Sequence, residues 1–348
     1  MTAPKFILSK SKLLEQYNKL KELGLKVSYS YKTNHEVGKV LQELEGAEDC
    51  EFSIHAFEEI EDIKDKSKIS FFTQAENKEE LKLLLEKGIR NFVVDNEIDL
   101  RRLLKVVESF GEKINLSLRM KFQEHRIGTG KYFVYGMSAG KVNELLNKIK
   151  ANPLIEKLGV HIHRKSQNVS EWLILDELKD SLGEEILRRI DFVNLGGGLP
   201  VKYRSYTGKA DDYIFEKIRE VVDWSNKKNI QTIIEPGRFL AAPAIQLETE
   251  IIQIQEKNLI INTTIYNCAV DNVLTGTKML VEGELDEVEE GNYYLIKGNS
   301  PTRDDIFRYR VKLKNPKVGD KIIFLNAGAY NYTTDFFGYK KLKTEIKE

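Results

Sequence analysis

Two buried strand-like runs end in residues that suit a phosphate and a charged ring. Three glycines, Gly196–Gly198, follow the apolar run Phe192–Leu195, and Glu235-Pro236-Gly237-Arg238 follows Thr232–Ile234. Consecutive glycines offer unobstructed backbone N–H groups, which can hold a phosphate. Glu235 and Arg238 add one anionic and one cationic contact. Together they suit a ligand with a basic ring nitrogen at one end and a phosphate at the other, and pyridoxal 5'-phosphate is such a ligand.

A lysine, two histidines and a serine could complete the site. Lys32 ends the apolar run Lys26–Tyr31, and an amine there could form a Schiff base with an aldehyde cofactor, although most of the 54 basic residues must be solvated surface. His161 and His163 alternate, so they share one face of a strand. A metal site would need a third ligand, which the neighbouring sequence lacks. A histidine packed inside a barrel and a ring stacked on a planar cofactor remain as interpretations, and Ser166 could donate to a phosphate.

The order of apolar and amphipathic segments predicts a parallel barrel. Short apolar runs alternate with helical patterns from about residue 25 to 240, as in β/α units. Seven or eight units fit a (β/α)8 TIM-like barrel, predicted over residues 10–242, whose ligands lie at the carboxyl ends of the strands. The predicted strands are Lys26–Tyr31, Ile69–Thr73, Asn91–Val94, Asn115–Met120, Leu158–His163, Phe192–Leu195 and Thr232–Ile234, and the helices include Glu79–Lys87, Glu97–Phe110, Ser138–Lys150 and Tyr213–Asn226.

The last hundred residues predict a second, all-β domain. Helical periodicity fades after about residue 245, and strand-like runs separated by Gly and Asn turns replace it. Lys5–Ser9 could join this sheet, so the β domain is predicted to comprise residues 1–9 and 243–348. Its predicted strands are Ile245–Gln255, Leu259–Tyr266, Tyr293–Lys297, Arg308–Lys312 and Lys321–Leu325.

The composition argues against several classes of function. Lys plus Arg and Asp plus Glu both number 54, so a net charge of zero gives no electrostatic reason to expect nucleic acid or an anionic membrane as partner. No apolar run is long enough to span a bilayer, and we expect no signal peptide. Cys50 and Cys268 are the two cysteines, too few for a disulfide framework or a cysteine-rich metal site. We therefore expect a cytoplasmic protein without a metal.

Together and in this order, the segments resemble the fold-type III pyridoxal-phosphate decarboxylases. This group comprises the diaminopimelate, ornithine, arginine and carboxynorspermidine decarboxylases, which share an alanine-racemase-like barrel. The resemblance covers nearly the whole chain. It implies an amino acid as substrate and a homodimer in which both protomers build each active site.

The resemblance also implies a role for each residue of the cofactor site. Lys32 would be the Schiff-base lysine. His163, within the string Gly159–Gln167, would stack on the pyridine ring, and Arg119 would line the site. Glu235 would hold the ring nitrogen protonated, which strengthens the electron sink. The phosphate would be held by Ser166, Gly196, Gly197, Gly198, Gly237, Arg238 and Tyr330.

The substrate side departs from the family's pattern. Pro301, within Gly298–Asp305, stands where the family has a proton-donating cysteine, so another group must act or the activity has changed. The arginine with which diaminopimelate decarboxylases grip a distal carboxylate is missing. Asp271 could instead contact a distal amine, as an aspartate does in ornithine decarboxylases. Arg303 could bind a distal carboxylate, and Asp305 would reach across a dimer interface into the partner's active site.

We expect α-decarboxylation of a basic or diamino acid of the ornithine, lysine or arginine type, as in polyamine biosynthesis, in preference to diaminopimelate. Glu235 favours this reaction because alanine racemases, by the family comparison, use arginine at that position. An amino-acid racemase or epimerase on the same scaffold is one alternative, which the lost cysteine keeps open. A non-catalytic pyridoxal-phosphate-binding protein is another, and the presence of a β domain argues against it.

Overall fold

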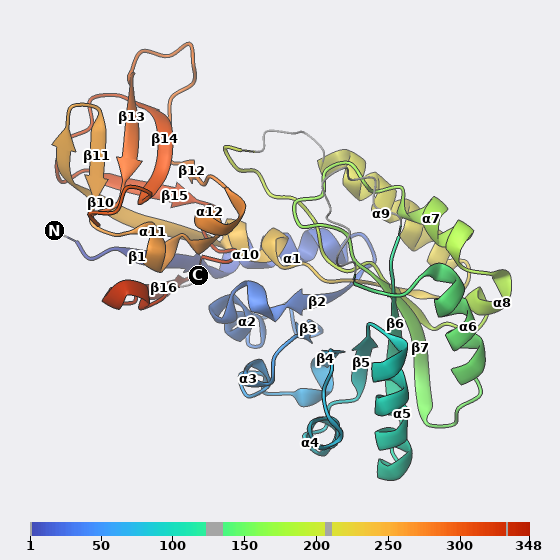
Figure 1. Cartoon of the computed structure of the whole chain (residues 1–348). Coiled ribbons are helices and arrows are strands. Elements are labelled where there is room, and N and C mark those ends of the chain that lie inside the picture. Colours follow the sequence, from blue (N-terminus) through green and yellow to red (C-terminus); the bar gives the residue numbers. More distant parts are fainter. Residues whose placement is uncertain (1, 123–134, 206–210, 332) are drawn as a thin grey trace.

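The first domain is a closed barrel of eight parallel strands (Figure 1). The computed structural model describes residues 2–122, 135–205, 211–331 and 333–348. Strands β2 to β9 neighbour one another in chain order around the barrel, and helices precede and follow them. The predicted (β/α)8 barrel is therefore confirmed. Its strands are β2 Lys26–Ser30, β3 Glu51–Ile54, β4 Ile69–Thr73, β5 Asn91–Val94, β6 Ile114–Met120, β7 Ile155–Ile162, β8 Phe192–Asn194 and β9 Gln231–Ile234.

The barrel helices have clear start signals and one apolar side. Asn77 and Glu80 form a capping box at the start of α4, and Asn96 accepts a bond from Asp99 N at the start of α5. Leu103 of α5 is fully buried against the barrel. The helices of this domain are α1 Lys10–Lys21, α2 His35–Leu41, α3 Phe57–Ile60, α4 Lys78–Glu86, α5 Glu97–Phe110, α6 Ala139–Ile149, α7 Ile174–Ser181, α8 Glu184–Leu187, α9 Asp211–Asn226 and α10 Arg238–Ala244.

The second domain is mostly sheet, as predicted, and lies to one side of the barrel (Figure 1). Strand order is β12-β15-β10-β11-β13-β14, and β1 Lys5–Ser9 pairs with both β10 and β16. The chain thus begins in this sheet, builds the barrel and returns through α10. Its other elements are β10 Ile245–Gln255, β11 Asn258–Ile261, β12 Leu280–Val281, β13 Asn292–Lys297, β14 Ile306–Leu313, β15 Lys321–Leu325, β16 Lys343–Lys347, α11 Ile265–Cys268 and α12 Val270–Thr275.

Two differences from the predicted elements bear on the site. The predicted strand Leu259–Tyr266 is wrong beyond Ile261, because Thr264 caps a helical turn by accepting a bond from Tyr266 N. Strand β3 was not predicted from the sequence. Its inward Ser53 hides the apolar signal of a buried strand, and that serine faces the site described below. None of the helices in the described parts of the chain is long and apolar enough to cross a membrane.

Candidate active site

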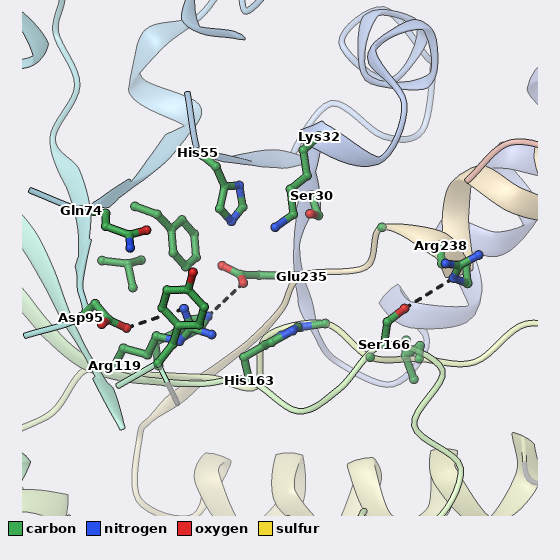
Figure 2. A pocket seen from close by; sticks show the side chains of 18 of the residues that line it. Ser30, Lys32, His55, Gln74, Asp95, Arg119, His163, Ser166, Glu235 and Arg238 are labelled. Carbon is green, nitrogen blue, oxygen red and sulfur yellow. Dashed lines mark hydrogen bonds and ion pairs between the residues drawn. The ribbon is translucent and has the colours of Figure 1, made fainter. Parts of the chain in front are cut away.

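A cavity of about 480 Å³ opens at the carboxyl end of the barrel strands (Figure 2). We call it the main cavity. Its volume is ordinary for a small-molecule or cofactor site. It brings together every predicted cofactor residue except Gly196. These residues are Lys32, Arg119, His163, Ser166, Gly197, Gly198, Glu235, Gly237, Arg238 and Tyr330.

Lys32 projects its amine into the main cavity from the turn Tyr31–Thr33 that follows β2 (Figure 2). Desolvation by the cavity walls lowers the pKa of this amine, and Arg119 lowers it further, whereas Glu235 opposes both effects. A lowered pKa leaves more of the neutral amine, which is the form that attacks an aldehyde. The position and environment of Lys32 therefore suit the predicted covalent attachment of an aldehyde cofactor.

Glu235 follows β9 and is surrounded by three hydrogen-bond donors. Its Oε1 accepts bonds from Ser53 Oγ at 2.8 Å and Asn194 Nδ2 at 2.9 Å, and its Oε2 lies 2.9 Å from His161 Nε2. Burial alone would raise the pKa of Glu235, but His161 and Ser53 outweigh burial and lower that pKa to about 2. Glu235 is thus a fixed anion, able to hold a protonated ring nitrogen.

His163 presents its ring to the main cavity from the segment after β7. Gly197 N donates to His163 Nδ1 at 3.1 Å, which orients the ring and leaves the proton on the other nitrogen. Burial, together with His161 and Arg119, lowers the pKa of His163 to about 3. A neutral, oriented imidazole facing the cavity is a suitable surface for a flat ring to stack on.

The glycine segment is shaped by close backbone approaches. Gly196 and Gly198 have φ of +65° and +110°, and a Cβ on Gly196 would lie 2.3 Å from Ile162 O. The donors differ from the prediction, however. Gly196 N donates to Asn194 Oδ1 and Gly197 N to His163, so of the three N–H groups only that of Gly198 has no partner among the described residues. The strand end therefore offers the predicted phosphate fewer open backbone donors than the glycine count indicates.

Arg238 lines the same end of the cavity and is paired with Asp271. Two parallel bonds of 2.7 and 3.0 Å join the guanidinium to the carboxylate, and both side chains are buried. Tyr203 Oη accepts a third bond at 3.1 Å, and the Tyr330 ring lies 5.1 Å from the guanidinium carbon. Only Nε, 3.5 Å from Ser166 Oγ, is directed toward that cavity residue. Asp271 thus neutralises the cation predicted to grip the phosphate.

The three predicted substrate residues lie outside the main cavity as the described residues define it. Asp271 is occupied by Arg238, so the expectation that it contacts a substrate amine conflicts with this geometry. Asp305 is fully buried and accepts bonds from Ile265 N and from Ser300 N and Oγ, so its carboxylate holds its own loop together instead of extending outward. Arg303 is exposed on that loop.

Arg119 and several residues that the sequence did not single out form the far wall. Arg119 lies 3.7 Å from Asp95 Oδ1 and 5.0 Å from the centre of the Tyr135 ring. His55 lines the cavity beside Lys32 (Figure 2), and its ring stacks on Phe72 with centroids 4.5 Å apart. Burial, followed by the Lys32 charge, lowers the pKa of His55 to about 4. The signal for His55 was the alternation of Ser53 and His55, which places both on the inner face.

No group of three or more His, Cys, Asp or Glu side chains in the described parts of the chain is arranged to hold a metal ion. The donors instead fit pyridoxal phosphate. An amine, a buried anion and an open imidazole face surround one end of the main cavity, and glycines that leave no room for a Cβ border the other.

The sequence-family model of the pyridoxal-binding domain of pyridoxal-dependent decarboxylases matches residues 10–242. The chain belongs to this family. The family resemblance, the decarboxylase class and pyridoxal phosphate as cofactor are thereby confirmed. The matched segment ends after Arg238, so it contains the barrel part of the site, and Tyr330 is supplied by the second domain.

Relatives of the decarboxylase differ in substrate. A 2-[(L-alanin-3-ylcarbamoyl)methyl]-2-hydroxybutanedioate decarboxylase of Staphylococcus aureus is 23% identical over 78% of this chain and 74% of its own length. A diaminopimelate decarboxylase of Zymomonas mobilis is 26% identical over 76% of this chain and 66% of its own. The fold is that of the lysine decarboxylase of Selenomonas ruminantium, with a TM-score of 0.81 at 20% identity, covering 99% of this chain and 93% of the other.

Proposed function

We propose that this decarboxylase removes the α-carboxyl group of a basic or diamino acid, using pyridoxal phosphate attached to Lys32. The observation that carries the proposal is Glu235, a buried anion with three donors that faces the same cavity as the lysine amine. An anion at the ring nitrogen favours the protonated ring, which is the stronger electron acceptor.

When bound, pyridoxal phosphate supplies the electron-accepting ring that takes up the electron pair left as carbon dioxide departs. The residues of the chain bind and orient. Lys32 supplies the amine, His163 supports one face of the ring, and Glu235 holds its nitrogen. Gly198 N, Ser166 and the Nε edge of Arg238 hold the phosphate.

The distribution of cations supports a substrate with a distal amine over one with a distal carboxylate. A distal carboxylate needs a cation to receive it. Among the described residues that line the main cavity, the two arginines already face carboxylates, Arg119 facing Asp95 and Arg238 facing Asp271. Lys32 is reserved for the cofactor. These pairings support lysine- or ornithine-type substrates over diaminopimelate.

Proton return to the α-carbon needs a donor other than the family's cysteine. Pro301 is exposed outside the cavity, and Cys268 is buried away from it, with burial raising the pKa of its thiol to about 12. His55, Tyr135 and Tyr330 are cavity residues that carry exchangeable protons. The donor is proposed to be among these three or a water beside them.

A substrate screen tests the proposal. Purified holoenzyme is incubated with lysine, ornithine, arginine, diaminopimelate and carboxynorspermidine, and carbon dioxide release is measured beside Lys32→Ala. We expect release from a diamino or basic acid and none from the variant. Exchange of the α-hydrogen with deuterium oxide, without carbon dioxide release, would instead identify a racemase. Binding of the cofactor with neither reaction would identify a non-catalytic binding protein.

The assembly and setting are proposed from the resemblance to the family. We propose a homodimer that acts in the cytoplasm in polyamine-type metabolism, with residues of both protomers completing each cavity. Analytical ultracentrifugation tests the assembly directly. A monomer that retains full activity would contradict the shared site.

A further inference from the structure

The turn that carries Lys32 is bound to the second domain at two points. Tyr330 N donates to Thr33 O at 3.0 Å, and Asn34 Nδ2 donates to Gly328 O at 2.8 Å. The two barrel residues follow the lysine directly in the chain, and they are only 0% and 6% exposed. Both bonds are therefore closed to solvent, and the lysine turn cannot shift without breaking a contact between the domains.

The same segment of the second domain also meets the predicted phosphate end of the main cavity. This segment, Asn326–Asn331, follows β15, and we call it the connector. The Tyr330 ring lies 5.1 Å from the guanidinium carbon of Arg238, and Asn331 Oδ1 accepts a bond from Asp271 N at 3.1 Å. The connector thus contacts the turn that holds the amine and also the ion pair at the other end of the site.

The connector is packed closely against α10, the helix that begins at Arg238. A Cβ on Gly328 would lie 1.8 Å from Ala241 O, so no larger residue fits there without moving the connector. Tyr330 has a φ of +56°, a conformation that a tyrosine rarely adopts and that persists only where the surroundings enforce it. A segment fixed in this way can keep the two ends of the main cavity at a constant separation.

Asn34 uses both ends of its side-chain amide. Its Oδ1 accepts bonds from Glu36 N at 3.0 Å and Val37 N at 3.3 Å, which caps α2, while its Nδ2 donates to Gly328 O. Donors on one side and a carbonyl on the other fix the orientation of the amide. An aspartate would place an oxygen against Gly328 O, and a serine could cap the helix but is too short to reach the connector as well. Asparagine therefore joins α2, the Lys32 turn and the connector.

We propose that Asn34 is a positioning residue, which sets the separation between the Lys32 amine and the phosphate end of the main cavity. The aldehyde and the phosphate of the cofactor are joined by a rigid ring, so the protein has to meet both at a fixed distance. A misplacement of about 1 Å can cost about 100-fold in such an arrangement. The inference rests on the proposed attachment of the cofactor to Lys32, whereas the contact between the domains does not.

The test compares pyridoxal phosphate with pyridoxal, which has the aldehyde but no phosphate. Each is titrated into the apoenzyme and reduced with borohydride, and peptide mapping gives the fraction of Lys32 that is modified. The proteins are wild type, Asn34→Ser and Asn77→Ser. Asn34→Ser keeps a capping oxygen and removes the bond to Gly328 O. Asn77→Ser is the matched control, because Asn77 caps α4 through a bond from Glu80 N.

We expect wild type to bind pyridoxal phosphate more tightly than pyridoxal. Asn34→Ser should reduce this preference by about tenfold or more and leave the affinity for pyridoxal within about twofold of wild type, because only the longer ligand has to fit both ends. Asn77→Ser should keep the wild-type preference. An equal weakening of both ligands in Asn34→Ser, or no change in either, would overturn the proposal. Absence of modification at Lys32 in the wild type would contradict the proposed function itself.

A second measurement on the wild type serves if Asn34→Ser does not fold. Hydrogen exchange of the Tyr330 amide, whose partner is Thr33 O, is followed by mass spectrometry before and after Lys32 is linked to pyridoxal. Pyridoxal has no phosphate to contact the connector directly. Exchange should nevertheless slow by about threefold or more, because ordering the lysine turn also orders the bond to Tyr330 N. Unchanged exchange would show that the turn and the connector are not coupled, and it would also overturn the proposal.

Discussion

Replacing Asp271 with asparagine distinguishes a role in pairing with Arg238 from a role in contacting a substrate amine. In the structure its carboxylate makes two parallel bonds to Arg238, and the two side chains are 2% and 5% exposed. Asparagine keeps one acceptor but removes the charge. Removal of one partner of a buried ion pair typically costs about 3–5 kcal/mol, so with one bond retained we expect the apoenzyme to lose about 2–4 kcal/mol of unfolding free energy.

The same substitution should improve phosphate binding. With Asp271 neutral, the Arg238 charge is no longer balanced inside the protein, and a phosphate becomes its preferred partner. A hydrogen bond to a charged group contributes about 1.5–3 kcal/mol, so inorganic phosphate and pyridoxal phosphate should bind at least about tenfold more tightly. Equilibrium dialysis gives the affinities, and urea unfolding with and without phosphate gives the stabilities.

The control for Asp271→Asn is a substitution in another ion pair of the second domain. Glu284→Gln weakens the partly buried pair that Glu284 forms with the buried Arg308 at 2.7 Å in the second domain, away from the main cavity, and should lower stability without changing phosphate affinity. If Asp271 contacts the substrate amine instead, Asp271→Asn would raise KM for diamino acids and leave phosphate affinity unchanged. That outcome would refute the role argued from the Arg238 pairing.

Three further predictions concern Glu235 and the strand end beside it. Glu235→Gln should retain bound cofactor but slow decarboxylation by about 10²–10³-fold, measured as kcat for carbon dioxide release. Because the pKa of Glu235 is lowered to about 2, its carboxylate contributes about 3 kcal/mol of stability above pH 5, and this contribution is lost as the pH falls toward 2. Urea unfolding between pH 6 and 3 should therefore show a smaller decline of the unfolding free energy for Glu235→Gln than for the wild type. A Cβ on Gly237 would lie 2.1 Å from Thr33 Oγ1, so Gly237→Ala should lower the thermal midpoint, and adding Thr33→Ala should recover part of the loss.

The sequence predicted the barrel because its strand and helix periods alternate, but it gave a weak signal wherever a strand faces a cavity. Strand β3 has Ser53 at an inward position and is followed directly by His55, which lines the main cavity, so it lacks the apolar run by which the other strands were predicted. The same polar alternation that hides a strand marks a functional surface. His55 was missed for that reason, although it lies beside Lys32.

Residue type predicted which side chains line the main cavity, but it did not predict which other residues their hydrogen-bonding groups are paired with. Arg238 reads as a free cation from its place after Glu235, and only the fold shows that Asp271, 33 residues later, has taken two of its bonds. Gly196 and Gly197 likewise read as open donors, yet their N–H groups are used by Asn194 and His163. Such pairings join distant segments, so local sequence carries no signal for them.

In the proposed arrangement, these pairings would give the two ends of the cofactor different electrostatic surroundings. At the proposed ring end, Glu235 accepts bonds from Ser53, Asn194 and His161 and also lines the main cavity, so it would face a cationic ring nitrogen. At the proposed phosphate end Asp271 balances the Arg238 charge, so neutral donors such as Gly198 N and Ser166 would contribute more of the binding. A phosphate held chiefly by neutral groups is held less tightly, which increases the importance of the covalent bond to Lys32 for retaining the cofactor. The effect of Lys32→Ala on cofactor retention should therefore be larger in the wild-type background than in Asp271→Asn, where Arg238 is released to the phosphate.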